Sequence, residues 1–507
     1  AKGELEDLVA QPAVRRWPSG LAAAGGIGLL FGGVAWGTFS DSDSPSPLPS
    51  LAVKTEASLL VVPFSNLTSD PEAAHLGDGI AWEISEGLKR IRDLSVFSRP
   101  SHVSAAALES DSGNGAGTRA SSILEGSVGE DGDELEIAVR IERPWTEDDG
   151  EGAWTRSYRI PKDGILSGLD RVAWDIAVEL GVQDSDRGSE ALVPLGTSDF
   201  HAYCDYLQGR YLARQGTPAA LEGAIEAYHR ALVLDSKVAA AWSALAVAYI
   251  LLPEYGGPSI PEVAPYAQAA VDHATAPGAQ FPEGLAASGF IKWSYHWDFQ
   301  GAEEDLRRSI ELDPFNPVSH YWLARALTSQ RRWEEAGDHA RAALELDPYS
   351  PAAYLTLGLL LMCEEEEGAA EAFRRGLELA PEMHPAAFLL GTLLALEGDL
   401  EGAAAEFDRF SGLIGKDPGP FHLYLSALSD SGKISEVVSA FRGLAFFGPT
   451  EEAAFLAHLG ETEVALARLE EAARSRSPYF LWANALPHFS GLRSDPRFRG
   501  ILAWAGY

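Results

Sequence analysis

The hydrophobic positions divide the chain into stretches with different periods. Residues 21–39, LAAAGGIGLLFGGVAWGTF, form an apolar run without a charge, and residues 40–57 are rich in Ser, Pro and Asp. Between residues 58 and 182, runs of period two alternate with helical runs, and from 198 to 507 the helical period continues almost throughout. The pattern predicts one apolar helix, a linker, a small α+β domain and an all-α region.

The apolar run has the length of a single transmembrane helix. Its 19 residues would span roughly 28 Å as a helix, which matches the hydrocarbon thickness of a bilayer. Trp17 and Trp36 fall where interfacial aromatic residues are expected. A cleaved secretory signal peptide is the alternative. The length of the run favours a retained anchor in contact with lipid.

Charges beside the apolar run predict its orientation. Basic residues precede it and acidic residues follow it: Lys2, Arg15, Arg16, Asp41 and Asp43. Basic flanks stay on the cytoplasmic side of a membrane. We therefore expect residues 1–20 in the cytoplasm, with Arg15 and Arg16 at the inner interface, and the bulk of the chain in a bacterial periplasm. Because the chain begins with a small residue, Ala1, we interpret it as a complete mature chain.

Small residues form two rows on the predicted membrane helix. Ala24, Gly28 and Gly32 make one row, and Gly33 and Gly37 make the other. Small residues four apart let a second helix approach closely in a membrane. The rows predict packing against a helix of an integral membrane protein. The alternative is that glycine only weakens a marginal anchor.

The pattern between residues 58 and 182 predicts a sheet covered by helices. Residues 58–64, SLLVVPF, indicate a buried strand, and an apolar stripe of period 3.6 follows at Ile80, Ile84, Leu88 and Ile91. Residues 121–130 and 134–142 read as a hairpin around Asp131-Gly132-Asp133. A further strand over 154–159 and a closing helix over 165–180 complete the predicted domain.

This stretch resembles a known family. VVPFSNLTSDPE, LGDGIAWEISEGLKRI and ILEGSV with the hairpin are similar to the TolB-like amino-terminal domain, over residues 56–182. The resemblance implies an α+β module that commonly follows a transmembrane helix and precedes helical repeats. In the family a cytoplasmic kinase, cyclase or winged-helix domain often stands before the membrane. Only about 20 residues do so in this sequence, so we expect no such output domain.

The helical region repeats itself with a period of about 34 residues. The clearest units are RRSIELDPFNP, RAALELDPYSP and RRGLELAPEMHP. Alanines recur in the second helix of each unit, at Ala302, Ala336, Ala369 and Ala403. Gly358 and Gly391 recur in the first helix, followed by Phe373 and Phe407 in the next one. The pattern is that of a tetratricopeptide repeat (TPR) solenoid over residues 198–507.

Such a solenoid stacks helix pairs around a concave groove. Alignment of the units places five residues toward it: Tyr321, Arg325, Leu355, Leu359 and Met362. We predict these as contacts for a periplasmic protein or peptide. The alternative for each residue is packing between repeats.

Charge and motif content narrow the function. The net charge of −35, from 74 acidic and 39 basic residues, excludes nucleic acid as an expected partner. Two cysteines make no disulfide framework, and the 12 histidines form no HExxH pattern. GxSxG and Walker patterns are also missing from the sequence. We therefore expect no catalytic residue, no metal and no cofactor.

These features together predict a non-catalytic accessory subunit. A glycine-faced helix and a large interaction solenoid favour a scaffold that stabilises a larger membrane complex, such as a photosynthetic or respiratory assembly. The main alternative is a periplasmic sensor that binds a peptide or small ligand in the groove and signals across the membrane. An enzyme is the third hypothesis.

Overall fold

The structure is a computed structural model of the chain. It describes residues 57–68, 75–91, 94–98, 120–143, 153–182, 197, 199–215, 217–255, 258, 260–276, 281–442, 444 and 448–507. The predicted membrane helix at 21–39, its glycine rows and its flanking Arg and Trp residues lie outside these residues. Within the described part, every helix is too short or too polar to cross a bilayer.

A mixed sheet forms the first part of the described fold. Its strands are β1 (Ala57–Val61), β2 (Ser65–Asn66), β3 (Leu94–Ser98), β4 (Ser122–Asp131), β5 (Glu134–Glu142) and β6 (Trp154–Pro161). The order is β3-β1-β4-β5-β6, with β2 beside β4. β1 runs parallel to β3 and β4, whereas β4, β5 and β6 are antiparallel. The predicted hairpin is confirmed, and Gly132 takes the positive φ of 63° that its turn requires. Strand β3 was not predicted.

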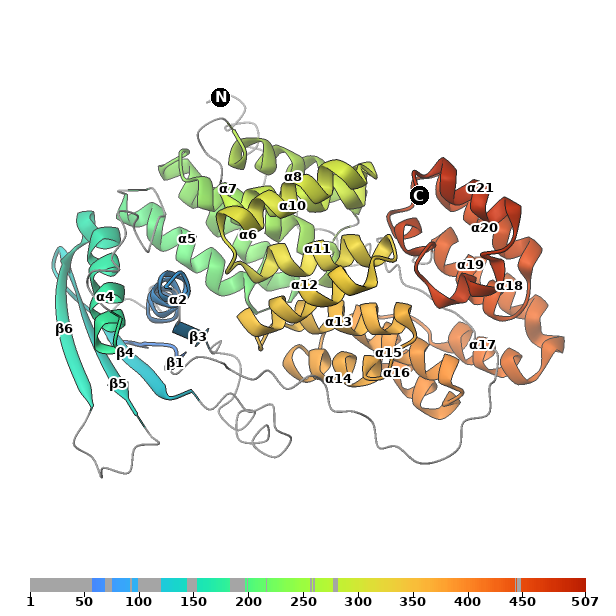
Figure 1. The fold of residues 1–507 in the computed structure, drawn as a ribbon, viewed down its shortest axis with the longest axis horizontal. Helices are drawn as coiled ribbons and strands as arrows, with labels where there is room; N and C mark the ends of the chain where they lie inside the picture. The colour runs from blue at the N-terminus through green and yellow to red at the C-terminus, as the bar shows by residue number, and fades with distance from the viewer. Residues whose placement is uncertain are drawn as a thin grey trace.

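Two helices cover one face of this sheet, α2 (His75–Lys89) and α4 (Ile165–Glu179). The stripe predicted from the period is confirmed, because Ile80, Ile84 and Leu88 are fully buried. Figure 1 shows α2 end-on between the sheet and the helical region, so α2 has neighbours on both sides.

The rest of the described chain is a series of antiparallel helix pairs. They are α5 (Phe200–Ala213) with α6 (Pro218–Leu234), α7 (Ala239–Leu251) with α8 (Ile260–Ala274), α9 (Pro282–Ile291) with α10 (Phe299–Leu312), α11 (Pro317–Ser329) with α12 (Trp333–Leu346), α13 (Pro351–Glu364) with α14 (Ala369–Leu379), α15 (His384–Glu397) with α16 (Leu400–Leu413), α17 (Gly419–Ser429) with α18 (Ile434–Arg442), and α19 (Pro449–His458) with α20 (Thr462–Arg474). The predicted all-α solenoid is confirmed.

Small residues allow the helices of a pair to pack closely. The alanines predicted for the second helices are buried: Ala302, Ala336, Ala369 and Ala403. A Cβ atom added at Gly358 would lie 2.6 Å from Cδ1 of Phe373, and one at Gly391 would lie 3.2 Å from Cδ1 of Phe407. Glycine at these two positions therefore makes room for a phenylalanine of the partner helix.

Polar caps start several of the first helices. The Asn316 side chain accepts the N–H of Val318 at 2.9 Å, and Ser350 accepts the N–H of Ala353 at 3.3 Å. Pro317 and Pro351 follow at the first helical position, which lacks an intrahelical N–H partner anyway. The Asn316-Pro317 and Ser350-Pro351 steps therefore mark the starts of two repeats.

The array curves enough to contact itself. The short helix η5 (Leu252–Tyr255), after α7, lies against α15, several repeats later. After α20 the chain continues as η8 (Pro478–Trp482), η9 (Pro487–Leu492) and α21 (Pro496–Trp504). We call residues 478–507 the C-terminal closure, because they return to the middle of the array. Figure 1 shows this last segment in red.

Candidate functional site

The C-terminal closure contacts the middle repeats mainly through aromatic rings. Phe480 stacks on Trp297, with ring centroids 5.4 Å apart and planes 19° apart. Trp482 meets Trp293 edge-on at 5.4 Å, and Tyr507 contacts Phe299 at 4.7 Å. The contact partners Trp293 and Trp297 belong to η6 (Lys292–His296) and its C-cap. The closure is therefore joined to the third repeat.

Hydrogen bonds add to this aromatic contact. The Asn484 amide donates to the backbone oxygen of Ser329 at 3.4 Å. The Arg493 guanidinium donates to the backbone oxygens of Ala485 and Leu486, at 3.1 and 3.0 Å. These bonds hold the closure as one unit against α11 and α13.

The residues predicted to line the groove lie inside this closed region. Tyr321, Arg325, Leu355, Leu359 and Met362 are each at most 6% exposed. The Arg325 Nε donates to the Thr356 hydroxyl at 2.9 Å, within the array. The side chains at these positions are therefore buried in the structure. Packing between repeats accounts for their burial, and contact with an outside ligand stays a prediction.

An open cavity lies elsewhere, between α2 and the first repeats. It has a volume of about 220 Å³. Its walls come from α2, α5, α6 and α7, and from the starts of α9 and α11. Trp82, Tyr206, Tyr228 and Phe281 supply aromatic wall, and acidic and basic side chains supply half of the rest. We call this space the domain cleft.

Close backbone contact holds α2 on α5 beside the cleft. A Cβ atom at Gly79 would lie 2.9 Å from Cδ1 of Leu207, so only glycine lets the helices approach this far. The His75 Nε2 is 3.0 Å from the backbone oxygen of Cys204. The position of α2 above the cleft is therefore set by direct contacts with the array.

Ion pairs cross the cleft or line it. Arg210 of α5 binds both carboxylate oxygens of Glu283 of α9, at 2.9 and 3.0 Å, and its guanidinium lies 3.9 Å over the Trp82 ring. Lys89 binds Glu86 at 2.8 Å within α2. Arg90 reaches Asp313, at the end of α10, at 3.6 Å. Thus α2 is tied to the array by stacking and by charge.

Glu83 is the unusual member of this set. Its side chain is 5% exposed, and its Oε1 has no hydrogen-bond partner among the described residues. Burial raises the pKa of Glu83 to about 8. Arg210 opposes the rise, while Glu86 and Glu283 add to it. The carboxyl is therefore largely protonated at neutral pH, and it faces the cleft.

Sequence reasoning missed the domain cleft. The period predicted the apolar stripe of α2 but no role for its other side, which carries Trp82, Glu83, Glu86, Lys89 and Arg90. A tryptophan among closely spaced charges was the available signal. Which repeat would lie opposite this side depends on the docking of α2, which the local sequence does not encode.

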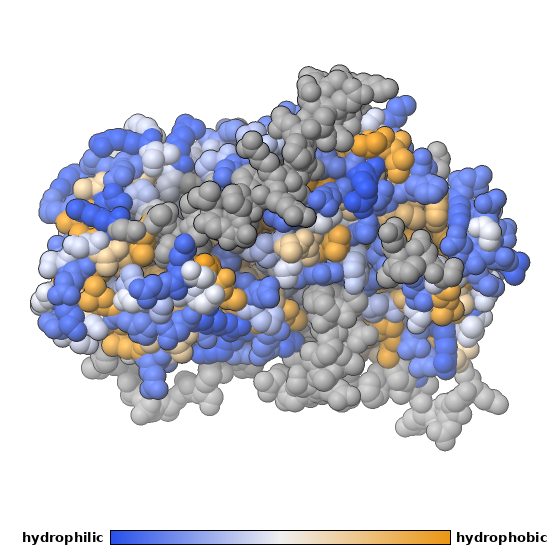
Figure 2. All heavy atoms as spheres, turned by 180° about the vertical axis from the view of Figure 1, so that it is seen from behind, coloured by the Kyte–Doolittle hydropathy of each residue, from blue (hydrophilic) through white to orange (hydrophobic). Residues whose placement is uncertain are grey.

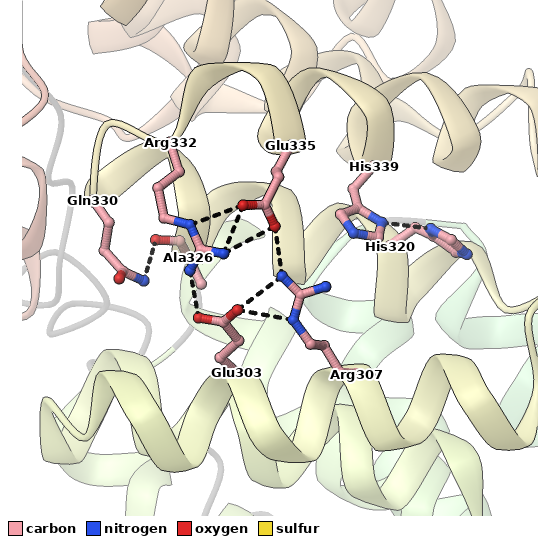
Figure 3. A network of polar contacts seen from close by, with 8 residues as sticks. All are labelled: Glu303, Arg307, His320, Ala326, Gln330, Arg332, Glu335 and His339. Atoms are coloured by element: carbon pink, nitrogen blue, oxygen red, sulfur yellow. Dashed lines mark hydrogen bonds and ion pairs between the residues drawn. The ribbon is translucent and has the colours of Figure 1, made fainter.

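A second polar network braces the outer helices of the array. Figure 3 shows Glu303 and Arg307 of α10 joined to Arg332 and Glu335 at the start of α12. Beside it, the Nδ1 atoms of His320 and His339 are 3.0 Å apart. Burial lowers the pKa of His339 to about 4, and His320 adds to the shift. His320 and His339 therefore contribute to packing between α11 and α12.

The two cysteines are free thiols in the structure. Burial raises the pKa of the Cys204 thiol to about 12 and raises that of Cys363 further. Protonated, buried thiols are poor nucleophiles. In the described ranges, no three His, Cys, Asp or Glu side chains come together as metal ligands.

Comparison with protein families identifies the repeats. A tetratricopeptide repeat model matches residues 295–351 and 367–418. The solved structure of pilF from Pseudomonas aeruginosa is 19% identical, with a TM-score of 0.32, and the match covers 42% of this chain and 96% of that one. Yeast Tom70 is 17% identical with a TM-score of 0.32, covering 60% and 67%. The family model confirms tetratricopeptide repeats within residues 295–351 and 367–418.

One relative matches this chain over part of its length. This chain is 26% identical over 320 residues to a Rhizobium meliloti (strain 1021) protein that is named as an adenylate cyclase. The match covers 60% of this chain, which spans only 46% of the relative's length. The cyclase activity in that name is a property of the relative. The absence of catalysis in this chain stays an expectation, as does the TolB-like identity of the first domain.

Proposed function

We propose that this chain is a membrane-anchored accessory subunit that binds and stabilises a larger membrane protein complex. The observation that carries the proposal is the series of helix pairs from α5 to α20 in the described residues, within which the TPR model matches. TPR arrays are protein-interaction scaffolds, and a stack of this length offers a large surface. The charge-free run at 21–39 would supply the anchor.

The outer surface is the part of the array that is free for partners. The C-terminal closure already contacts the middle repeats, through Trp293, Trp297 and the backbone of Ser329. Figure 2 shows small hydrophobic areas scattered among hydrophilic residues on one face. Partner contacts on such a surface would be mostly polar, with apolar anchors such as the 60% exposed Trp504.

The membrane helix offers the sharpest test. Gly28→Leu with Gly32→Leu should leave membrane insertion intact, because the segment becomes more apolar. It should release the chain from its complex, because two bulky side chains separate the helices. Ala23→Leu with Thr38→Leu is the matched control, since both positions fall outside the glycine rows at 100° per residue. Co-purification from native membranes is the measurement, and equal recovery of both double variants contradicts the proposal.

We also propose that the array faces the periplasm, from the basic residues Arg15 and Arg16 before the apolar run. Protease added to spheroplasts should then digest the array and leave cytoplasmic proteins intact. An array that survives until the membrane is broken would reverse the orientation. The role of a periplasmic sensor remains the alternative hypothesis.

A further inference from the structure

We infer that the domain cleft is a binding site for a small organic cation, with a primary ammonium or guanidinium group held by Glu83. This inference goes beyond the scaffold role and does not depend on it. It rests on the geometry of the charges around the cleft and on the unpartnered oxygen of one buried carboxyl.

The charges that line the cleft are already paired, with one acid left over. Among the described lining residues, Arg210 pairs with Glu283, Lys89 with Glu86 and Arg90 with Asp313. The remaining charged lining residues besides Glu83 are Arg214 and Asp347, which are partly exposed and opposite in sign. Glu83 alone is deeply buried without a cationic partner. A ligand cation would give Glu83 the oppositely charged partner that Glu86, Glu283 and Asp313 already have.

The buried carboxyl also needs a hydrogen-bond donor. An oxygen that is removed from water and left without a partner is costly, and native interiors rarely keep one. An ammonium group supplies three donors on a compact cation, and a guanidinium supplies a flat set of them. Either group satisfies the Glu83 Oε1 and its charge in one contact. Burial raises the pKa of Tyr203 and Tyr206, and the Glu83 carboxyl adds to both shifts.

The walls of the cleft limit the rest of the ligand. At about 220 Å³ the space admits a molecule of a few heavy atoms. Val247 and Leu251 of α7 offer aliphatic wall, and Phe281 offers an aromatic one. A short apolar chain carrying the cationic group fits these surfaces. An anion would have to compete with Glu283, Glu86 and Asp313 for cations that those acids already hold.

Binding of the cation should release a proton. Glu83 is surrounded by Arg210 and Arg90, which lower its pKa, and by Glu86 and Glu283, which raise it. With a pKa of about 8 the carboxyl holds its proton at pH 7. When the ammonium binds, the carboxyl ionises, its proton passes to the buffer, and an ion pair forms. No bond of the ligand is broken.

The test is calorimetric titration of the full chain in lipid nanodiscs with n-butylammonium chloride at pH 7. Two buffers with different ionisation enthalpies report the number of protons released. We expect close to one proton per bound ligand, with no binding of the neutral n-butanol or the anionic butyrate. About 0.15 M NaCl screens non-specific attraction to the acidic surface.

Two variants separate the site from the background. Glu83→Gln keeps the shape of the protonated acid and should weaken binding about tenfold or more, with loss of proton release. Glu451→Gln is the matched control, because burial also raises the pKa of Glu451 to about 8 but far from the cleft, in α19. It should change neither affinity nor proton release.

Three results would overturn the inference. These are preferential binding of butyrate, unchanged affinity in the Glu83→Gln variant, or wild-type binding without proton release at pH 7. The last result needs no variant, so the test remains decisive even if Glu83→Gln fails to fold. Because the isolated chain is used, failure here leaves the scaffold proposal standing.

Discussion

The array contacts other parts of its own chain at two places that differ in chemistry. At the domain cleft, α2 meets the first repeats through ion pairs and one stacked arginine, Arg210 on Trp82. At the C-terminal closure, residues 478–507 meet the middle repeats through aromatic pairs such as Phe480 with Trp297. The first contact leaves a cavity, whereas the second buries the residues beneath it.

The difference follows from how each kind of side chain packs. Aromatic rings fill volume and carry few groups that need partners, so they can exclude water completely. Charged groups need opposite charges at defined distances, and the backbone must leave room for them. A contact built from charged side chains, such as the domain cleft, can therefore leave room for a small ligand. A contact built from aromatic rings, such as the C-terminal closure, leaves no such room.

The largest expected effect comes from removing a ring of the closure. Phe480→Ala should lower the free energy of unfolding by about 3–5 kcal/mol, because a fully buried ring is replaced by a cavity. Urea denaturation followed by tryptophan fluorescence measures the change. Trp504→Ala is the control and should cost little, since Trp504 is exposed. A loss below about 1 kcal/mol for Phe480→Ala would mean that the closure is only loosely attached.

A smaller effect is expected at the cleft. Arg210→Met should lower the free energy of unfolding by about 2 kcal/mol, because Glu283 loses its partner in a site that is 16% exposed. The double variant Arg210→Met with Glu283→Gln should recover at least half of this loss, because no unpaired charge remains. Thermal unfolding of both variants provides the measurement. A double variant less stable than the single one would show that stacking on Trp82 outweighs the ion pair.

A change of one pH unit should have the smallest effect, and the two regions should respond in opposite directions. Glu83 has a folded pKa of about 8 against 4.5, so its contribution to stability is lost as pH rises through this interval. Burial lowers the pKa of His458, beside the closure, from 6.5 to about 4, so its contribution is lost as pH falls through that interval. Each slope is at most about 1.4 kcal/mol per pH unit.

Unfolding of the variants Glu83→Gln and His458→Gln across pH 5 to 8 isolates the two slopes. The stability of wild type relative to Glu83→Gln should fall toward alkaline pH, and the stability of wild type relative to His458→Gln should fall toward acid pH. Parallel curves for wild type and Glu83→Gln would show that Glu83 is ionised in the folded chain.

The sequence predicted those elements that are determined by residues close together in the chain. The hairpin at Gly132 has a turn signal between alternating strands, and the stripe at Ile80, Ile84 and Leu88 has a helical period. The repeats were visible because Gly358 and Phe373 recur one unit later as Gly391 and Phe407.

What the sequence did not predict depends on distant contacts. Strand β3 is five residues long and is recognised only by its pairing with β1. Trp297 and Phe480 stack on each other although more than five repeat lengths separate them in the sequence. The sequence around either residue gives no indication of this contact. The burial of Glu83 depends on the packing of α2 against α5, which the local sequence does not encode.

The link between Trp297 and Phe480 also changes how the array should respond to force. An open solenoid stretches like a spring and loses repeats one by one from its ends, because each repeat contacts only its neighbours. Here the C-terminal closure contacts the third repeat, so this contact and the intervening helices together form a closed loop. Tension between the termini would load this contact first, which makes it a mechanical latch.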